Sequence, residues 1–224
     1  MPNFTAPTAA PISAVLDIPA GIVRFIAADR TDTVVEVRPA DASKGRDVKA
    51  AEQTSVEYAE GVLRIAAPAK NQLMGASGSV EVTVQLPAGS RVDAKAASAE
   101  LRGVGRLGDV VFEGAQASVK LDEAASAHLT LEAGDVSVGR LGGSARISTQ
   151  KGDLRIAEAL RGTVELHTEY GEISVGAARG VSATLDAGTS LGRIHNALHN
   201  ADGAAAGLDI RATTAYGDIT ARSL

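Results

Sequence analysis

Hydrophobic and polar residues alternate in short runs along most of this 224-residue chain. The run Val80–Leu86 alternates at every position and ends at Pro87-Ala88-Gly89. Alternation with a period of two places one face of a β-strand in a core and the other in solvent. Glycine and proline residues separate the runs, as expected for turns between short strands. The pattern predicts an all-β protein.

One phrase occurs three times in the middle of the chain: glycine, an acidic residue, then an apolar, a polar and another apolar residue. It begins at Gly134, Gly152 and Gly171, so its copies are 18 and then 19 positions apart. A second alternating run precedes each copy, which gives a repeat unit of two short strands joined by a Gly–acid turn. Such a unit cannot bury its own apolar face, whereas stacked copies can. We therefore predict a β-solenoid with about 18–19 residues per coil.

Further copies can be placed from about residue 90 to the end of the chain, the last two with insertions. The aligned turn positions are Ala99, Ala117, Gly134, Gly152, Gly171, Gly192 and Gly217. We predict a single domain, with residues 1–11 as a disordered lead-in, 12–89 as a sandwich-like N-terminal β cap and 90–224 as the solenoid. The last coil, residues 208–221, is expected at the end of the stack. The loop 195–207 is expected to fold across that end as a cap.

Two other solenoids have similar repeat lengths. A left-handed β-helix of hexapeptide repeats needs an aliphatic residue at every sixth position, but from Leu129 this register reaches Asp135 and Asp153. A leucine-rich repeat needs a Leu-x-x-Leu-x-Leu consensus with Asn, which is absent. We expect neither fold.

The composition argues against several functions. A net charge of −5 without clusters of Lys and Arg argues against nucleic acid, whose phosphates need a basic surface. The absence of cysteine removes disulfides and thiolate chemistry and is in keeping with a reducing compartment. The apolar stretch 12–28 is interrupted by charged residues, proline and glycine, so it predicts neither an export signal nor a membrane span. We expect a cytoplasmic protein.

The chain resembles a known bacterial family over nearly its whole length. The resemblance rests on Ile18-Pro19-Ala20-Gly21, on Val34–Arg38, on Gly78–Gly89 and on the repeated Gly-Asp-aliphatic turns up to Gly217-Asp218-Ile219. These features are similar to the DUF4097 family, also described as β-strand repeat proteins or proposed adhesins, in the short form without a signal peptide that occurs in actinobacteria. The resemblance implies a right-handed β-solenoid with no established enzymatic activity.

The acidic residues that follow the turn glycines are a candidate site. Stacked strands are about 4.8 Å apart, so these carboxylates would lie in a column. The column is either a ladder of cation sites or turn chemistry, in which glycine adopts a positive φ and the carboxylate accepts backbone N–H groups. Arg193 stands in place of one acid and the nine-residue Ca²⁺ repeat is absent, so we favour turn chemistry and expect no metal or cofactor. The turn ladder comprises Gly134, Asp135, Gly152, Asp153, Gly171, Glu172, Gly217 and Asp218.

Other motifs point to no enzyme. His195 and His199 have the spacing of a zinc site on a helix, but no Glu lies between them and no apolar periodicity supports a helix. No nucleophile elbow or phosphate loop is present, and a chain with 3% aromatic residues and no Trp supplies few platforms for sugars. Leu73 and Met74 form an apolar pair in a loop. The pair is either a candidate partner contact or, as we favour, a plug folded onto the open end of the solenoid.

These observations predict a non-enzymatic structural or interaction scaffold with an unknown protein partner, present as a monomer or a small oligomer. One alternative is a self-assembling filament of the bactofilin type, built through exposed coil ends. A second alternative is a polysaccharide-active β-helix enzyme, which would need clustered carboxylates on one outer face.

Overall fold

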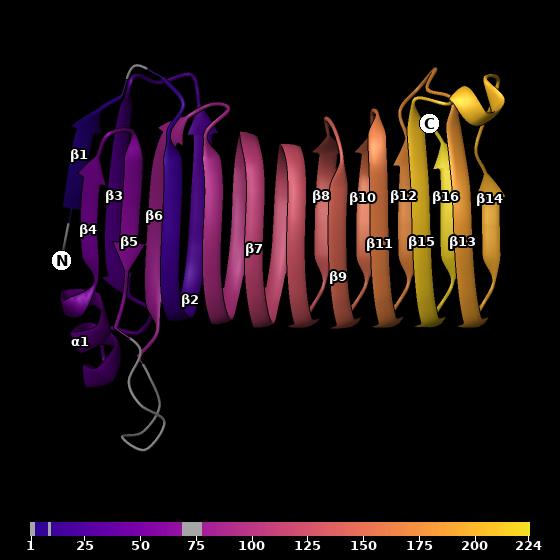
Figure 1. Ribbon diagram of the computed structural model, residues 1–224. Helices are drawn as coiled ribbons and strands as arrows, with labels where there is room; N and C mark the ends of the chain where they lie inside the picture. Colours follow the sequence, from indigo (N-terminus) through magenta and orange to yellow (C-terminus); the bar gives the residue numbers. More distant parts are fainter. Residues whose placement is uncertain (1–2, 9, 69–77) are drawn as a thin grey trace. The chain divides into compact units, whose positions relative to one another are not determined.

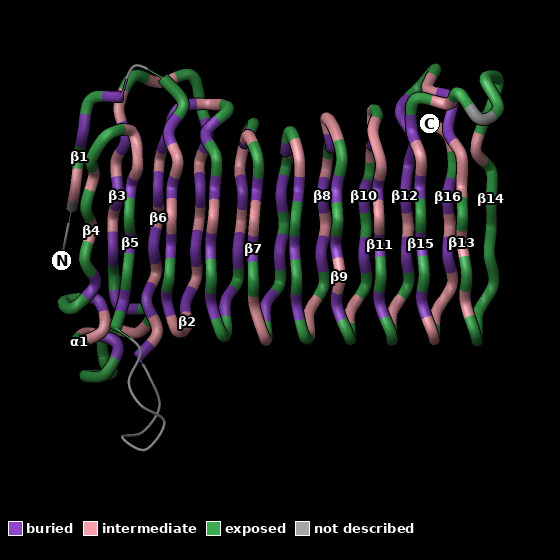
Figure 2. Tube along the Cα trace, viewed as in Figure 1, coloured by how far each residue is buried: buried purple, intermediate pink, exposed green. Residues whose placement is uncertain are grey.

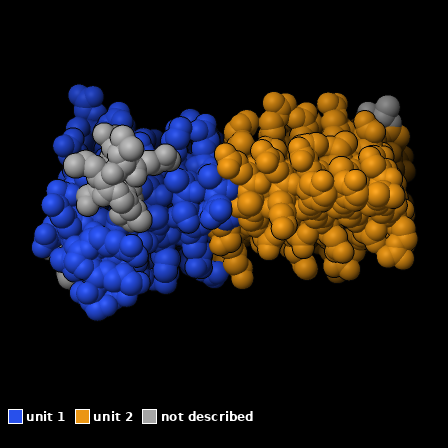
Figure 3. Space-filling model, turned by 90° about the horizontal axis from the view of Figure 1, so that it is seen from below, with its two compact units in different colours: residues 1–117 blue, residues 118–224 orange. Residues whose placement is uncertain are grey.

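The computed structural model describes residues 3–8, 10–68 and 78–224 (Figure 1). The chain divides into two compact units, Met1–Ala117 and Ser118–Leu224 (Figure 3). Strands dominate both units, and the described helices are α1 (Gly45–Gln53) and the short 3-10 helix η2 (Gly203–Ala205). Neither of these described helices is long and apolar enough to cross a membrane. The predicted all-β fold is confirmed.

Unit 1 is a sandwich of two layers that share strand β2. Its strands are β1 (Asn3–Pro7), β2 (Ser13–Ala28), β3 (Asp32–Pro39), β4 (Ser55–Ala59), β5 (Val62–Ala66), β6 (Val80–Pro87) and the first part of β7 (Arg91–Ala133). Residues 13–17 of β2 pair in parallel with β5 and with β7. Residues 21–28 of β2 pair in parallel with β6, and residues 21–27 pair with a later part of β7. Antiparallel β4 extends the first layer, and antiparallel β3 and β1 extend the second, which gives the predicted sandwich-like cap.

Residues 3–7 form an ordered strand, so the expected disordered lead-in is wrong for this part of the chain. β1 pairs antiparallel with β3. Its alternate side chains point inward, since Ala6 is buried, and the buried Thr8 that follows has its Oγ1 3.0 Å from Oγ1 of Thr33. Pro7, one of the prolines that suggested disorder, is tolerated because an edge strand has a side where no ladder bond needs the missing N–H.

Unit 2 is built of two-strand coils stacked in parallel. It contains the last part of β7, β8 (Val136–Leu141), β9 (Ala145–Lys151), β10 (Leu154–Ala159), β11 (Gly162–Tyr170), β12 (Ile173–Ala177), β13 (Ala183–Leu191), β14 (Ile194–Ala197), β15 (Leu208–Tyr216) and β16 (Ile219–Ser223). The first sheet has the order β7-β9-β11-β15-β13, and the second has the order β7-β8-β10-β12-β16-β14. Each pair within these sheets is parallel, which is the predicted solenoid stacking.

The core of unit 2 lies between the two sheets. Buried and exposed residues alternate along its strands (Figure 2). Inward residues stack on their counterparts, so Leu166 lies opposite Ile147 in β9 and Ala212 in β15. Each fully buried aliphatic side chain contributes about 1.5–3 kcal/mol, and stacking buries a further row with every coil.

The coils do not stack in the order of the sequence. β15 lies between β11 and β13, and β16 lies between β12 and β14. The coil 208–223 is thus inserted between the coils 162–177 and 183–197, and the expectation that residues 208–221 end the stack is wrong. Asn196, opposite Ala221, gives a physical reason. Its amide would be buried in a coil with two neighbours, but it stays exposed at the end.

Candidate interaction surface

The turn glycines of unit 2 lie in a column in the order 134, 152, 171, 217 and 192, as their contacts show. Gly134, Gly152 and Gly217 have φ of 132°, 147° and 151°, which L side chains rarely adopt. The coils also approach closely here, because a Cβ on Gly152 would lie 2.1 Å from the carbonyl oxygen of Gly134. Conformation and space both require glycine at Gly152 and Gly217, whereas at Gly171 and Gly192 the close approach alone does.

The acids that follow the glycines bind the backbone of the next coil. Asp135 Oδ1 accepts a hydrogen bond from the N–H of Asp153, and Asp153 Oδ1 accepts one from the N–H of Glu172, both at 2.8 Å. Asp218 accepts from the N–H of Arg193 at 2.9 Å and from its guanidinium at 2.8 Å. The guanidinium bond lowers the pKa of Asp218 and raises the pKa of Arg193. These three carboxylates therefore join neighbouring coils. Among the described side chains, no group of three or more His, Cys, Asp and Glu is placed to hold a metal ion.

A row of threonines supports the same turns from inside. The buried hydroxyl of Thr168 donates to the carbonyl oxygen of Gly152 at 3.0 Å. Thr214 and Thr189 donate in the same way to the glycine carbonyl of an adjacent coil, each at 3.1 Å. The bonds satisfy hydroxyls that would otherwise be unpaired in the core. Sequence reasoning missed this row, although Thr stands three positions before the turn glycine in these coils.

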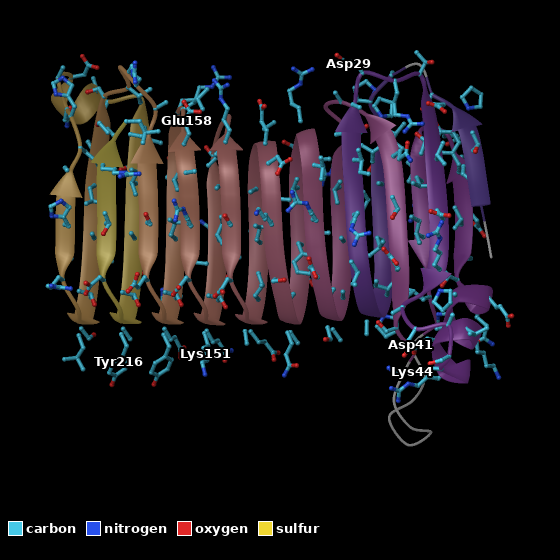
Figure 4. All side chains as sticks on the ribbon, turned by 180° about the vertical axis from the view of Figure 1, so that it is seen from behind. Asp29, Asp41, Lys44, Lys151, Glu158 and Tyr216 are labelled. Carbon is cyan, nitrogen blue, oxygen red and sulfur yellow. The ribbon has the colours of Figure 1, made fainter. Side chains whose placement is uncertain are left out.

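The residues just before the turn glycines form an exposed ridge. We call Lys151, Tyr170, Tyr216 and Leu191 the tyrosine ridge, because they are register neighbours in this order. The rings of Tyr170 and Tyr216 stack with centroids 4.9 Å apart and planes 3° apart. The two tyrosines are 52% and 47% exposed, and Leu191 is 63% exposed. Lys151 and Tyr216 point away from the turns into solvent (Figure 4).

The last coil in space ends in an open edge, formed by β13 and β14. In the described residues, β13 pairs only with β15 and β14 only with β16. Leu185 and Ala187, which point inward, are half-buried, and β14 is exposed along its whole length (Figure 2). The large hydrophobic side chains that are exposed in the described part of the chain all lie within residues 170–224, and two of them, Leu191 and Ile194, belong to the open edge. The full set is Tyr170, Leu191, Ile194, Tyr216 and Leu224.

The loop between β14 and β15 leaves this edge uncovered. Ser182 Oγ accepts hydrogen bonds from two backbone N–H groups of the loop, at 2.9 and 3.0 Å. Ser223 Oγ accepts one from the N–H of His199 at 2.8 Å. These bonds fasten the loop beside the start of β13 and the end of β16. The expected cap over the end of the stack is wrong, since Leu191 and Ile194 stay exposed.

A charged row crosses the outer face of the first sheet. Glu165 pairs with Arg146 at 2.6 Å and with Arg211 at 3.6 Å. His167 Nδ1 lies 2.8 Å from Oγ1 of Thr213. These residues line a hollow of about 310 Å³. Because each of the three charges already has a partner of opposite sign, the hollow offers a ligand little electrostatic attraction.

Comparisons with known proteins agree with this architecture. The family described as Toastrack DUF4097 matches residues 23–223. The chain belongs to the DUF4097 family. The resemblance drawn from the sequence is therefore confirmed.

Several solved structures are similar to this DUF4097 chain over nearly its whole length. A proposed adhesin from Bacteroides fragilis is 11% identical with a TM-score of 0.49, and the match covers 98% of this chain and 95% of that one. A proposed adhesin from Parabacteroides distasonis is 14% identical with a TM-score of 0.44, covering 98% and 96%. A proposed cell adhesion protein from Clostridium sporogenes is 10% identical with a TM-score of 0.39, covering 100% and 99%. No curated protein sequence matches the chain.

Sequence reasoning located the turns of this DUF4097 protein but missed its ridge. Leu73 and Met74, the candidate partner contact, lie outside the described residues. His195 lies in strand β14, so the two histidines do not share a helix. The signal for the ridge is the position before each turn glycine, which changes from Lys151 to tyrosine in the coils nearer the open edge.

Proposed function

We propose that this DUF4097 protein is a non-enzymatic interaction scaffold that binds a protein partner through the tyrosine ridge. One observation carries the proposal: the exposed large hydrophobic side chains of the described chain all lie within residues 170–224. Exposed apolar side chains that gather in one place mark interaction sites more often than scattered ones do. Tyrosine suits such a site because it buries a large apolar ring and keeps a hydroxyl for hydrogen bonding.

The geometry of the ridge favours a protein over a sugar. A sugar ring packs on the open face of an aromatic ring. The ring centroids of Tyr170 and Tyr216 are 4.9 Å apart and the ring planes are nearly parallel, so each ring covers one face of the other. The register places Lys151 beside Tyr170 and Leu191 beside Tyr216 on the remaining sides. Ring edges are therefore the parts that a partner meets, as in contacts with protein side chains.

The ridge stands on a fixed backbone. The carbonyl oxygen of Tyr170 accepts the N–H of Gly152, and that of Tyr216 accepts the N–H of Gly171, both at 2.9 Å. The glycine column beside the ridge adds close contacts between coils. A surface held in this way loses little conformational freedom on binding, which favours affinity.

The test compares the wild type with a Tyr170→Ser/Tyr216→Ser double variant, and uses Arg155→Ser, on an exposed position of β10, as the matched control. Proteins captured from the native cell by the wild type and the control but not by the double variant are purified and titrated directly. We expect the double variant to weaken direct binding at least ~10-fold, the size typical of a buried tyrosine anchor. Equal binding by the double variant would refute the ridge as the site. Ridge-dependent binding to a glycan array in place of any protein would refute the protein partner.

The cytoplasm is the location that we propose for this scaffold. The support is compositional, because a chain without cysteine needs no oxidising compartment for its stability. Fractionation of the native cell, followed by detection of the protein, tests it. Recovery at the cell surface or in the medium would contradict the proposal.

A further inference from the structure

Strand β13 of the open edge lacks the features that normally keep a strand edge from pairing. Natural edge strands are protected by proline, by lysine, by inward-pointing charges or by a covering loop. β13 has no proline and no lysine, and its one charged residue, Asp186, belongs to the outward-facing set. Its inward residues Leu185 and Ala187 are uncharged and incompletely buried. This edge presents unpaired backbone groups above an apolar interior.

The surface that fits such an edge is another coil of the same width. Within unit 2, neighbouring coils stack most of their inward aliphatic residues in register, as Leu185 does on Ile210. A second copy of this chain offers the same inward side chains, the same two strands and the same spacing between its sheets. We propose that two copies pair through their open edges, with β13 antiparallel to β13 of the second copy about a two-fold axis at Gly188.

The register follows from the residues of β13. In a two-fold antiparallel pair, residues equally distant from the axis face each other on the same side of the sheet. An axis at Gly188 sets Leu185 against Leu191 and Asp186 against Ser190 of the second copy. An axis at Asp186 would set two carboxylates directly opposite, which is unfavourable. An axis at Ala187 would set Leu185 against a threonine. Of these three axes, only the one at Gly188 places one leucine opposite another and keeps like charges apart.

The same axis serves the second sheet. A two-fold axis perpendicular to the first sheet also passes through the second, so β14 is brought beside β14 of the second copy. Ile194, now 46% exposed, then leaves water together with Leu191. One operation thus covers exposed apolar side chains of both sheets. The axis meets β14 near Asn196, because Gly188 and Asn196 each lie four positions from the turn glycine Gly192. The inward amide of Asn196 then faces the same amide of the second copy, which can accept and donate hydrogen bonds, whereas an aliphatic neighbour such as Ala221 cannot.

A head-to-tail contact is less favourable than this like-with-like contact. In the described residues of unit 1, no large hydrophobic side chain is exposed. An edge of unit 1 therefore offers the open edge little apolar surface in return. A contact between two identical surfaces closes on itself and gives a dimer, whereas a head-to-tail contact would grow without limit.

The axis residue provides a selective test. Gly188 faces outward, its φ lies outside the left-handed region, and a Cβ there would have no atom within 4 Å. Gly188→Lys and Gly188→Asp should therefore fold, yet each places two like charges face to face on the axis. Gly207→Lys is the matched control, because Gly207 also has open space around a Cβ and lies outside β13.

Sedimentation equilibrium decides the proposal. We expect the wild type and Gly207→Lys to form dimers and each Gly188 variant to raise the dimer Kd at least ~10-fold. An equimolar mixture of Gly188→Lys and Gly188→Asp should recover a heterodimer, because opposite charges then face each other. A wild type that stays monomeric up to its solubility limit, or that grows into open filaments, would overturn the proposal. So would Gly188 variants that dimerise like the wild type.

A second measurement needs no variant. Hydrogen exchange of the wild type at low and high protein concentration should show backbone amides of β13 and β14 gaining protection as the dimer forms. Protection that is independent of concentration would contradict pairing at this edge. The result is separable from the proposed function although both surfaces include Leu191, because the ridge double variant changes only β11 and β15 and leaves β13, with Gly188 and Leu191, unchanged. A monomeric protein that still binds its partner through the ridge would refute the dimer alone.

Discussion

Replacing Gly152 with alanine tests how closely the coils of unit 2 must approach. The new Cβ would lie 2.1 Å from the carbonyl oxygen of Gly134, a separation below 3.0 Å that real Cβ atoms essentially never show. Relief needs a local shift of about 1 Å between strands that are about 4.8 Å apart. The shift strains two flanking hydrogen bonds, Gly134 N–H to Lys151 at 2.8 Å and Gly152 N–H to Tyr170 at 2.9 Å. Each bond contributes about 1 kcal/mol net, and the positive φ of 147° costs about 1 kcal/mol more for alanine. We expect the free energy of unfolding to fall by about 3 kcal/mol.

Three further glycines separate the two causes. Gly171 has the close contact, 2.0 Å to the oxygen of Gly152, but its φ lies outside the left-handed region. Gly180 has a φ of +78° and no atom within 4 Å of a Cβ. Gly207 has neither constraint. Alanine at these positions should cost about 2, about 1 and less than about 0.5 kcal/mol in this order.

Thermal unfolding followed by circular dichroism measures the series. A loss of 1 kcal/mol lowers Tm by about 2–4 °C in a chain of this size, so Gly152→Ala should melt about 6–12 °C below the wild type. The reasoning is refuted if Gly152→Ala and Gly207→Ala have the same melting temperature. If Gly180→Ala is damaging while Gly171→Ala is not, the φ angle alone requires glycine and the close contact is irrelevant.

Three other predictions concern the same turns. Thr168→Val should lower the free energy of unfolding by about 1 kcal/mol, because the Gly152 carbonyl loses its hydroxyl donor. Urea unfolding measures this loss, with Thr130→Val at an exposed position as the control. Equal urea midpoints for the two variants would contradict the prediction. Arg193→Ala should raise the pKa of Asp218 toward its ordinary value of 3.8, followed by NMR titration. Since folding lowers the pKa of Asp218, the stability that this carboxylate contributes is present above its ordinary pKa and is lost as pH falls through its pKa in the folded protein. The wild type and Arg193→Ala should therefore differ in Tm near neutral pH and have the same Tm in acid. A difference in Tm that persists in acid would indicate lost packing instead. Melting temperatures in EDTA and in millimolar Ca²⁺ should agree, because the carboxylates of Asp135 and its counterparts are engaged with backbone N–H groups, and a clear rise with Ca²⁺ would revive the cation ladder.

The repeat and its turns could be predicted because core packing and backbone geometry both restrict the sequence there. Gly152 and Asp153 are recognisable in the repeat for two physical reasons. A side chain at Gly152 would clash with the Gly134 carbonyl, and the Asp153 carboxylate accepts a hydrogen bond from the backbone of the next coil. The ridge could not be found in this way. Tyr170 and Tyr216 point into solvent, where no core constraint repeats, so their meeting follows from register alone.

The order in which the coils stack could not be predicted from the alternation of hydrophobic and polar residues either. An inward aliphatic such as Leu185 fits equally well on any neighbouring coil, so alternation identifies the strands without ranking their partners. The polar Asn196 was the available signal, because an inward amide is tolerated at an open end and unfavourable inside the stack. We instead expected each coil to rest on the coil before it in the sequence, which placed residues 208–221 at the end of the stack.

The inserted coil has a consequence for how the protein is made. A ribosome releases residues 183–197 before residues 208–223, yet the later coil is the one on which the earlier coil rests. During synthesis, β13 and β14 therefore have no template until the last strands emerge. The stack can grow from its first coils in step with translation as far as β12, but the two coils that follow must assemble in the reverse of their order of synthesis.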